Sequence, residues 1–223
     1  MPLRVKPFIA SLFGAGLLAA GVGAQAAAVT LTGWTYGAGH AVQTTGPVYT
    51  GRAGGFTGSL TGAGVRFDTP SFQTYCVELT ESFSFSGVPM LGYAVVDGAS
   101  YFGADVAERI GKLMTFVDDH PTAVDDSLES AGLQLALWNL MYDGDQSLAD
   151  GSFRDLQARA PYATSLLAAA QSVSASRYDV FALSKVGSQD FLLTTLRVPE
   201  PGSLALTGLA LAALGGLRAR RRR

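Results

Sequence analysis

The chain has 223 residues, of which 48% are hydrophobic and 15% charged, with 27 glycines and a formal net charge of −2. This length suits one domain with processing segments, and the apolar content is sufficient for a folded core. Abundant glycine and sparse charge are typical of a strand-rich extracellular module rather than a cytoplasmic enzyme. A single cysteine excludes an intramolecular disulfide.

Residues 1–26 have the pattern of a secretory signal peptide. Arg4 and Lys6 provide the positive region, and a short segment rich in Leu and Ala provides the apolar region. The small residues Ala24 and Ala26 then form a small-x-small cleavage site. We expect cleavage after Ala26, with Ala28 as the second choice. A membrane anchor is less consistent with the pattern because the apolar region is short and ends in small residues.

The segment from Ala27 to about Gly98 has the pattern of β-structure. Val29 to Thr32 is a first strand, and Ser82 to Phe85 alternates polar and apolar residues, which predicts a strand with both phenylalanines on the core face. The glycines from Gly51 to Gly64 predict hairpin turns. A phosphate-binding loop is the functional alternative, but no Gly-Lys-Ser/Thr follows.

Cys76 lies within this β-region, and we expect it on a strand or at a strand end. Tyr75 and Val77 would then face the opposite side. A lone thiol outside the cytoplasm is a liability unless it is buried or used. The ordinary explanation is that Cys76 is a small buried hydrophobe.

The middle of the chain changes to a helical period. Phe102 to Val117 predicts a helix that Pro121 stops, and a second helix is expected to end at Asp143-Gly144. Two further helical segments, Phe153 to Ala160 and Tyr162 to Ser174, would be separated by Pro161. Strands are expected at Tyr178 to Leu183 and Phe191 to Val198. We therefore predict an α+β fold with a strand-rich, barrel-like or sandwich-like half and a helical subdomain that contains Gln134.

Gln134 stands inside the apolar run Leu133 to Met141. A continuous apolar run predicts a helix buried on most sides, here capped near Asp126 or Ser127. Gln134 would lie inside, one turn before Trp138 on the same face. A buried carboxamide left unpaired costs about 1–3 kcal/mol, so this residue needs an explanation.

A cysteine thiol and a glutamine carboxamide permit one particular reaction. The thiolate attacks the amide carbon, ammonia leaves, and an internal thioester remains. Tyr75-Cys76-Val77 on a strand, followed by a helix with Gln134-x-Ala136-x-Trp138, resembles the thioester domains of bacterial surface adhesins. In many members a threonine precedes the glutamine where this chain has Leu133, and the gap between Cys76 and Gln134 looks short for that family.

The resemblance implies a Cys76–Gln134 thioester in a domain spanning residues 27–197. A lysine amine would convert it to an isopeptide bond, so the protein would accept a nucleophile once rather than turn over as an enzyme, with no cofactor. We expect Tyr75 and Trp138 to shield the bond from water. The general base could be Glu78, His120 or His40, and the sequence does not choose between them.

The C-terminal tail combines three features. Pro199-Glu200-Pro201 precedes an apolar run of about 14 residues, Leu204 to Leu217, which as a helix is roughly 21 Å long against a hydrocarbon core of ~30 Å. A terminal arginine cluster follows, consisting of Arg218, Arg220, Arg221, Arg222 and Arg223. These arginines would stay cytoplasmic and leave the domain outside.

This tail resembles the PEP-CTERM sorting signal of Gram-negative bacteria. The resemblance implies processing by an exosortase near Pro-Glu-Pro, a transient inner-membrane intermediate through residues 204–217, and a product at the cell surface or in the extracellular matrix. A generic tail anchor is the alternative.

The domain between residues 27 and 197 is acidic, because it contains nine Lys and Arg and seventeen Asp and Glu, a net charge of −8. Such an acidic domain repels nucleic acid and attracts amines at low salt.

The residue types allow three other sites. A cysteine hydrolase would pair Cys76 with His40 or His120, but no familiar signature surrounds Cys76. Asp143 to Asp150 has calcium-type ligands but lacks the EF-hand glycine and closing glutamate, which favours a solvated acidic loop, so no metal site is expected. The carboxylates Asp118, Asp119, Asp125 and Asp126 are interpreted as a charged helix connection.

The main alternative function is a non-covalent matrix or carbohydrate-binding envelope module with an inert Cys76.

Overall fold

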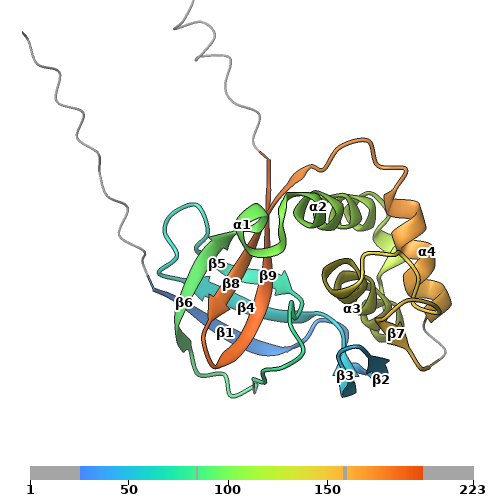
Figure 1. Cartoon of the computed structure of the whole chain (residues 1–223). Coiled ribbons are helices and arrows are strands. Elements are labelled where there is room, and N and C mark those ends of the chain that lie inside the picture. Colours follow the sequence, from blue (N-terminus) through green and yellow to red (C-terminus); the bar gives the residue numbers. More distant parts are fainter. Residues whose placement is uncertain (1–25, 84, 158–159, 198–223) are drawn as a thin grey trace, which may run out of the picture.

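The structure, a computed structural model, describes residues 26–83, 85–157 and 160–197 (Figure 1). The signal peptide predicted for residues 1–26 lies outside the described residues except for Ala26, and the sorting segment predicted for residues 198–223 lies wholly outside them. Within the described ranges, no helix is long and apolar enough to span a membrane.

Six antiparallel strands form the main sheet in the order β5-β4-β1-β6-β8-β9. Their bounds are β1 (Ala27–Trp34), β4 (Phe56–Thr61), β5 (Thr69–Thr74), β6 (Met90–Asp97), β8 (Tyr178–Lys185) and β9 (Ser188–Leu196). The two end strands approach each other just beyond β5, where Cys76 forms a bridge with Phe191 of β9. The sheet is therefore a nearly closed barrel, and the α+β prediction with a strand-rich half is confirmed.

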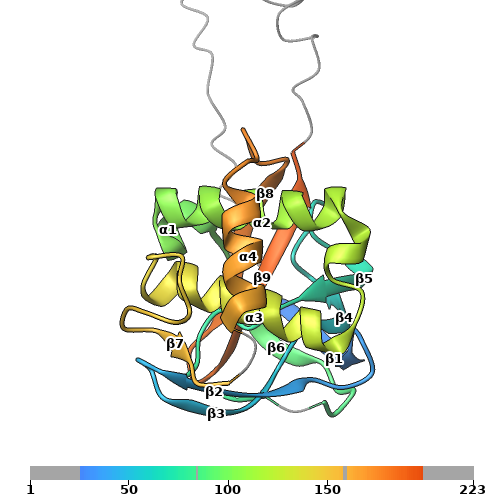
Figure 2. The same cartoon turned by 90° about the vertical axis from the view of Figure 1, so that its right-hand side faces the viewer.

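A small second sheet has the order β3-β2-β7. It consists of β2 (His40–Thr45), β3 (Tyr49–Ala53) and the two-residue β7 (Arg154–Asp155). Figure 2 shows β2 and β3 running below α3. Because β7 lies between α3 and α4 in the chain, its pairing with β2 ties the segment that joins these two helices to the N-terminal half.

The helices gather on one side of the barrel (Figure 1). They are α1 (Gly98–Phe102), α2 (Ala104–Asp119), α3 (Ser127–Tyr142) and α4 (Ala160–Ala170), with a 3-10 turn at Pro121–Ala123. Every residue of α3 from Ser130 to Leu140 is buried, which explains its unbroken apolar run. Gly132 permits α4 to approach closely, because a Cβ there would lie 2.6 Å from the Tyr162 ring.

The start and end of α3 follow the predicted chemistry. The Asp126 side chain accepts hydrogen bonds from the backbone N–H groups of Leu128 and Glu129, and this is the capping arrangement expected at a helix N-terminus. At the other end Asp143 is the C-cap, and Gly144 adopts φ 72°, a conformation that glycine accepts readily. The predicted helix Phe102 to Val117 and the strands at Val29, Tyr178 and Phe191 are likewise confirmed with shifted ends.

Two predicted elements are wrong. Ser82, Phe83 and Phe85 lie outside any strand, because both phenylalanine rings pack on Phe56 at centroid distances of 4.8 and 5.6 Å instead of following a neighbouring strand. The alternation of polar and apolar residues in Ser82 to Phe85 therefore corresponds to two rings that share one aromatic neighbour, and not to a strand.

The second error is the helix predicted from Phe153 to Ala160. Phe153 is buried against Tyr142 and Trp138, and β7 follows it as an extended segment. Pro161 does not separate two helices, because α4 begins at Ala160 and proline is tolerated in the first turn.

Candidate functional site

The candidate site begins where the chain leaves β5 and pairs briefly with β9. Tyr75 O accepts a hydrogen bond from Leu192 N at 2.9 Å, and Val77 N donates to Asp190 O at 3.1 Å. These two bonds flank the Cys76–Phe191 pair in antiparallel fashion. In such a pair the central residue directs its own N–H and C=O away from the partner strand. The backbone of Cys76 therefore needs partners on the side facing α3.

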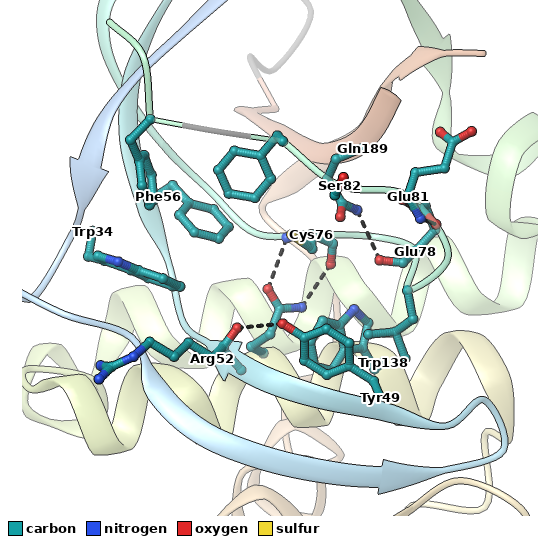
Figure 3. Close-up of a pocket in the computed structure, with 15 residues that line it drawn as sticks. Trp34, Tyr49, Arg52, Phe56, Cys76, Glu78, Glu81, Ser82, Trp138 and Gln189 are labelled. Atoms are coloured by element: carbon teal, nitrogen blue, oxygen red, sulfur yellow. Dashed lines mark hydrogen bonds between the residues drawn. The ribbon is translucent and has the colours of Figure 1, made fainter. Parts of the chain in front are cut away.

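Gln134 supplies both partners from α3. Cys76 N donates to Gln134 Oε1 at 2.9 Å, and Gln134 Nε2 donates to Cys76 O at 2.8 Å (Figure 3). The Gln134 side chain is fully buried and Cys76 is 7% exposed. The structure thus brings together the two residues that the sequence singled out, and the hydrogen bonds to Cys76 account for burying a carboxamide in an apolar helix.

The Cys76 thiol is held in its neutral form. Burial, reinforced by the nearby Glu78 carboxylate, raises the pKa of the thiol well above its ordinary value. Because the thiolate is the nucleophile, any reaction of this sulfur requires a base that takes the proton as the new bond forms.

A pocket of about 240 Å³ opens over Cys76 and Gln134. Its apolar wall is aromatic and consists of Trp34, Phe56, Phe83 and Phe85. Its polar wall consists of Glu78, Glu81, Ser82 and Gln189, and Arg52 lines the pocket on the side of Trp34 (Figure 3). Figure 3 shows Trp34 and Phe56 on one side of Cys76, and Glu78, Glu81 and Gln189 on the other.

Trp138 and Tyr75 were expected to shield the site, and they occupy different places. Trp138 lines the pocket, is 2% exposed and packs on the Tyr49 ring in a T-shaped arrangement at a centroid distance of 5.6 Å. Its indole Nε1 has no hydrogen-bond partner among the described residues. Tyr75 is also buried, but it is not among the pocket-lining residues. Its hydroxyl lies 3.4 Å from Ser130 Oγ, and burial raises its pKa to about 12.

Of the three candidate bases, only Glu78 is among the residues that line the pocket. Its carboxylate also accepts hydrogen bonds from the backbone N–H groups of Thr80 and Glu81, which hold the turn after Cys76. His120 stacks on Phe116 at the end of α2, and His40 begins β2. The histidines required by the cysteine-hydrolase alternative are therefore absent from the pocket lining.

The acidic segments have structural explanations. Asp143 Oδ2 accepts from Ser152 N and Phe153 N, and these bonds lower the pKa of its carboxyl. Asp145 accepts from the Asn139 side chain and from Ser147 N. The segment proposed as a calcium alternative is thus a loop whose carboxylates bind backbone amides.

The other carboxylates lie at helix ends, as the sequence indicated. Asp118 and Asp119 form ion pairs with Arg177 at 2.5 and 2.8 Å. Ligand atoms of Asp125, Asp126 and Glu129 lie within 4.8 Å of one another, but Asp126 caps α3 and Glu129 accepts from Asp125 N. This arrangement fits a helix connection.

Sequence reasoning missed most of the pocket walls. Trp34, Arg52 and Gln189 come from β1, β3 and β9, and no local pattern relates these strands to Cys76. The local signal for these walls is the aromatic pair Phe83 and Phe85, whose alternation with serine instead predicts a strand. Comparisons with protein-family models, curated proteins and solved structures find no match to this chain.

Removing the Gln134 carboxamide should destabilise the fold beyond its effect on chemistry. In a Cys76→Ala background, where no thioester can form, Gln134→Ala leaves a buried N–H and a buried C=O of residue 76 without partners. We expect the free energy of unfolding in urea to fall by about 2–5 kcal/mol. Gln171→Ala, which removes an exposed carboxamide from the turn after α4, is the matched control. A loss below about 0.5 kcal/mol would contradict the role assigned to these bonds.

Proposed function

We propose that the mature protein is an exported cell-surface or matrix protein in which Cys76 and Gln134 join as an internal thioester that captures an amine-bearing partner. One observation is the main support. The carboxamide to be attacked is held by two hydrogen bonds on the backbone of the residue that bears the sulfur. Both residues are buried at the base of a pocket.

The hydrogen bonds suit the chemistry of closure. Sγ of Cys76 attacks Cδ of Gln134, the amide oxygen gains negative charge, and Nε2 leaves as ammonia with the thiol proton. Cys76 N already donates to that oxygen at 2.9 Å, the distance expected of an oxyanion donor. Holding the two groups in one place supplies an intramolecular advantage that reaches ~7–11 kcal/mol in well-oriented systems. Glu78 is the candidate base because it lines the pocket and acts on the thiol electrostatically.

During capture of the partner the sulfur of Cys76 is the leaving group, whereas it is the nucleophile during closure. An amine attacks Gln134 Cδ, the C–S bond breaks, and the thiol of Cys76 is released as the new amide forms. Each molecule reacts once, so the protein is a covalent adhesin rather than an enzyme. Burial of Gln134 and the aromatic wall of the pocket would slow hydrolysis by limiting water.

Export is the second part of the proposal and rests on the two terminal segments. The signal peptide would direct the chain across the inner membrane, and the tail would hold it there through residues 204–217 until an exosortase cleaves near Pro199-Glu200-Pro201. The acidic domain would then remain at the cell surface or in the extracellular matrix.

One observation favours the non-covalent alternative. The oxygen and the nitrogen of the Gln134 carboxamide each have a hydrogen-bond partner in the Cys76 backbone, so the burial of Gln134 does not require a thioester. A carbohydrate-binding or matrix-binding module could use the same pocket with an inert thiol.

Intact mass decides between these two functions. Closure expels ammonia, so the mature protein should be lighter than its sequence mass by one ammonia. Methylamine should add its full mass to the closed protein and expose one thiol to a maleimide, because amine attack releases the sulfur. Cys76→Ala and Gln134→Ala should each lack the deficit. A wild-type protein of full sequence mass whose single thiol titrates without methylamine would leave the non-covalent module as the function.

Export is tested separately in the native host. Deleting residues 199–223 should release or mislocalise the protein, because the apolar run and the arginines that hold it at the membrane are lost. Replacing Pro199, Glu200 and Pro201 with alanine should instead retain an uncleaved, membrane-bound chain. Cell fractionation with C-terminal mass mapping measures both. Wild-type protein that keeps Arg223 and stays in the inner membrane would contradict sorting by an exosortase.

A further inference from the structure

We infer that the captured amine belongs to an amino sugar, a ring that bears a free amine beside a hydroxyl group, rather than to a protein lysine. The inference rests on the proposed function, because it names the partner of the same pocket. Two independent features support it, the unpartnered indole N–H of Trp138 and the division of the pocket into aromatic and polar walls.

The first feature is a hydrogen-bond donor without an acceptor. Trp138 follows Gln134 by one helical turn, lines the pocket and is 2% exposed, and its Nε1 has no partner within the described part of the chain. Figure 3 shows the indole nitrogen turned toward the Cys76 segment. Buried donors almost always have a partner, so this N–H points to an acceptor oxygen that arrives with the ligand.

The position of this donor restricts the chemistry of the amine. Because Trp138 and Gln134 share one helix face, the acceptor must lie close to the attacking nitrogen. A lysine ε-amine is attached to a chain of four methylene groups and brings no such oxygen. A 2-amino sugar has hydroxyl groups on both carbons next to the one that bears the amine.

The second feature is the arrangement of the walls. Trp34, Phe56, Phe83 and Phe85 provide ring faces on one side, and Glu78, Glu81 and Gln189 provide polar groups on the other. A sugar ring has an apolar C–H face that packs on the negative face of an aromatic ring, and hydroxyl edges that bond to carboxylate and amide groups. A straight alkyl stem would leave most of the polar wall unused.

Proton binding favours the same amine. Glu78 and Glu81 lie in a domain of net charge −8 and would attract the ammonium form of either amine, so charge does not choose between them. The electron-withdrawing hydroxyl groups of an amino sugar lower the pKa of its amine below the value of about 10.4 for lysine. More of the free base, which is the nucleophile, is therefore present near neutral pH.

The transfer step balances without a further reagent. The neutral sugar amine forms a C–N bond with Gln134 Cδ while the C–S bond breaks. The proton lost by the nitrogen passes to the sulfur and restores the thiol of Cys76. The product is an amide between the protein and the sugar, heavier than the closed protein by the whole mass of the amine.

The experiment compares rates of covalent addition to the wild-type mature domain by intact mass, each divided by the concentration of free amine. The probes are methyl glucosaminide against Nα-acetyl-lysine methylamide, and trans-2-aminocyclohexanol against cyclohexylamine, which differ by one hydroxyl. One added hydrogen bond predicts a preference of roughly 3- to 10-fold for the first member of each pair. N-acetylglucosamine, which lacks a free amine, should not add.

Variants test which residues cause the preference for the hydroxyl-bearing amine. Trp138→Phe removes the N–H and should bring the aminocyclohexanol-to-cyclohexylamine ratio to about one, and Trp34→Ala should lower the rate of methyl glucosaminide relative to methylamine. Phe67→Leu is the control, because Phe67 packs on Phe181 outside the pocket lining and should leave both ratios unchanged. The wild-type ratios remain informative if a variant fails to fold.

The results separate this inference from the proposed function. Equal rates within both pairs, or a faster reaction of the lysine analogue, overturn the amino-sugar assignment while methylamine addition leaves the thioester intact. A protein of full sequence mass that takes up no methylamine overturns both.

Discussion

Two hydrogen bonds between the Gln134 carboxamide and the backbone of Cys76 are the constraint on which the rest of the structure depends. The bridge to Phe191 directs the N–H and C=O of Cys76 away from β9, and no strand in the described part of the chain pairs with Cys76 on the other side. A side chain from α3 takes the place of that strand. Both the oxygen and the nitrogen of the buried Gln134 carboxamide must reach the Cys76 backbone. The position of α3 along its axis and its rotation about that axis therefore have to be fixed.

The surrounding elements provide that fixation. Asp126 caps the start of α3, and Asn139, which is fully buried, bonds to the loop at residues 145–147 after its end. Gly132 lets α4 pack closely on the outer side. The pocket over Cys76 then follows from the gap between this helix, the end of β5 and the aromatic cluster. Its chemistry combines a neutral buried thiol, a carboxamide oxygen with a donor already in place and an indole N–H that has no acceptor among the residues described.

Local patterns predicted the elements whose signal lies in their own residues, whatever their neighbours in the fold. The α3 cap, the helix α2 and the strands β1, β8 and β9 followed from residue types and spacing. The predicted strand at Ser82 to Phe85 was wrong because the same alternation arises when two rings pack on one aromatic neighbour. Cys76 and Gln134 were paired through their chemistry, whereas Gln189 reaches the pocket through the pairing of β9 with the Cys76 segment, which is distant in the chain. Such long-range pairings leave no period in a single sequence.

The most direct measurement is a tryptic peptide map of the native-purified protein, digested briefly near pH 6.5 to limit attack on a thioester. Cys76 lies in the peptide of residues 67–109 and Gln134 in the peptide of residues 113–154, since neither contains an internal lysine or arginine. The account predicts that the two peptides are recovered joined, with a mass one ammonia below their sum, and that hydroxylamine separates them. Recovery of two separate peptides, with a free Cys76 thiol and an unmodified Gln134, would contradict it.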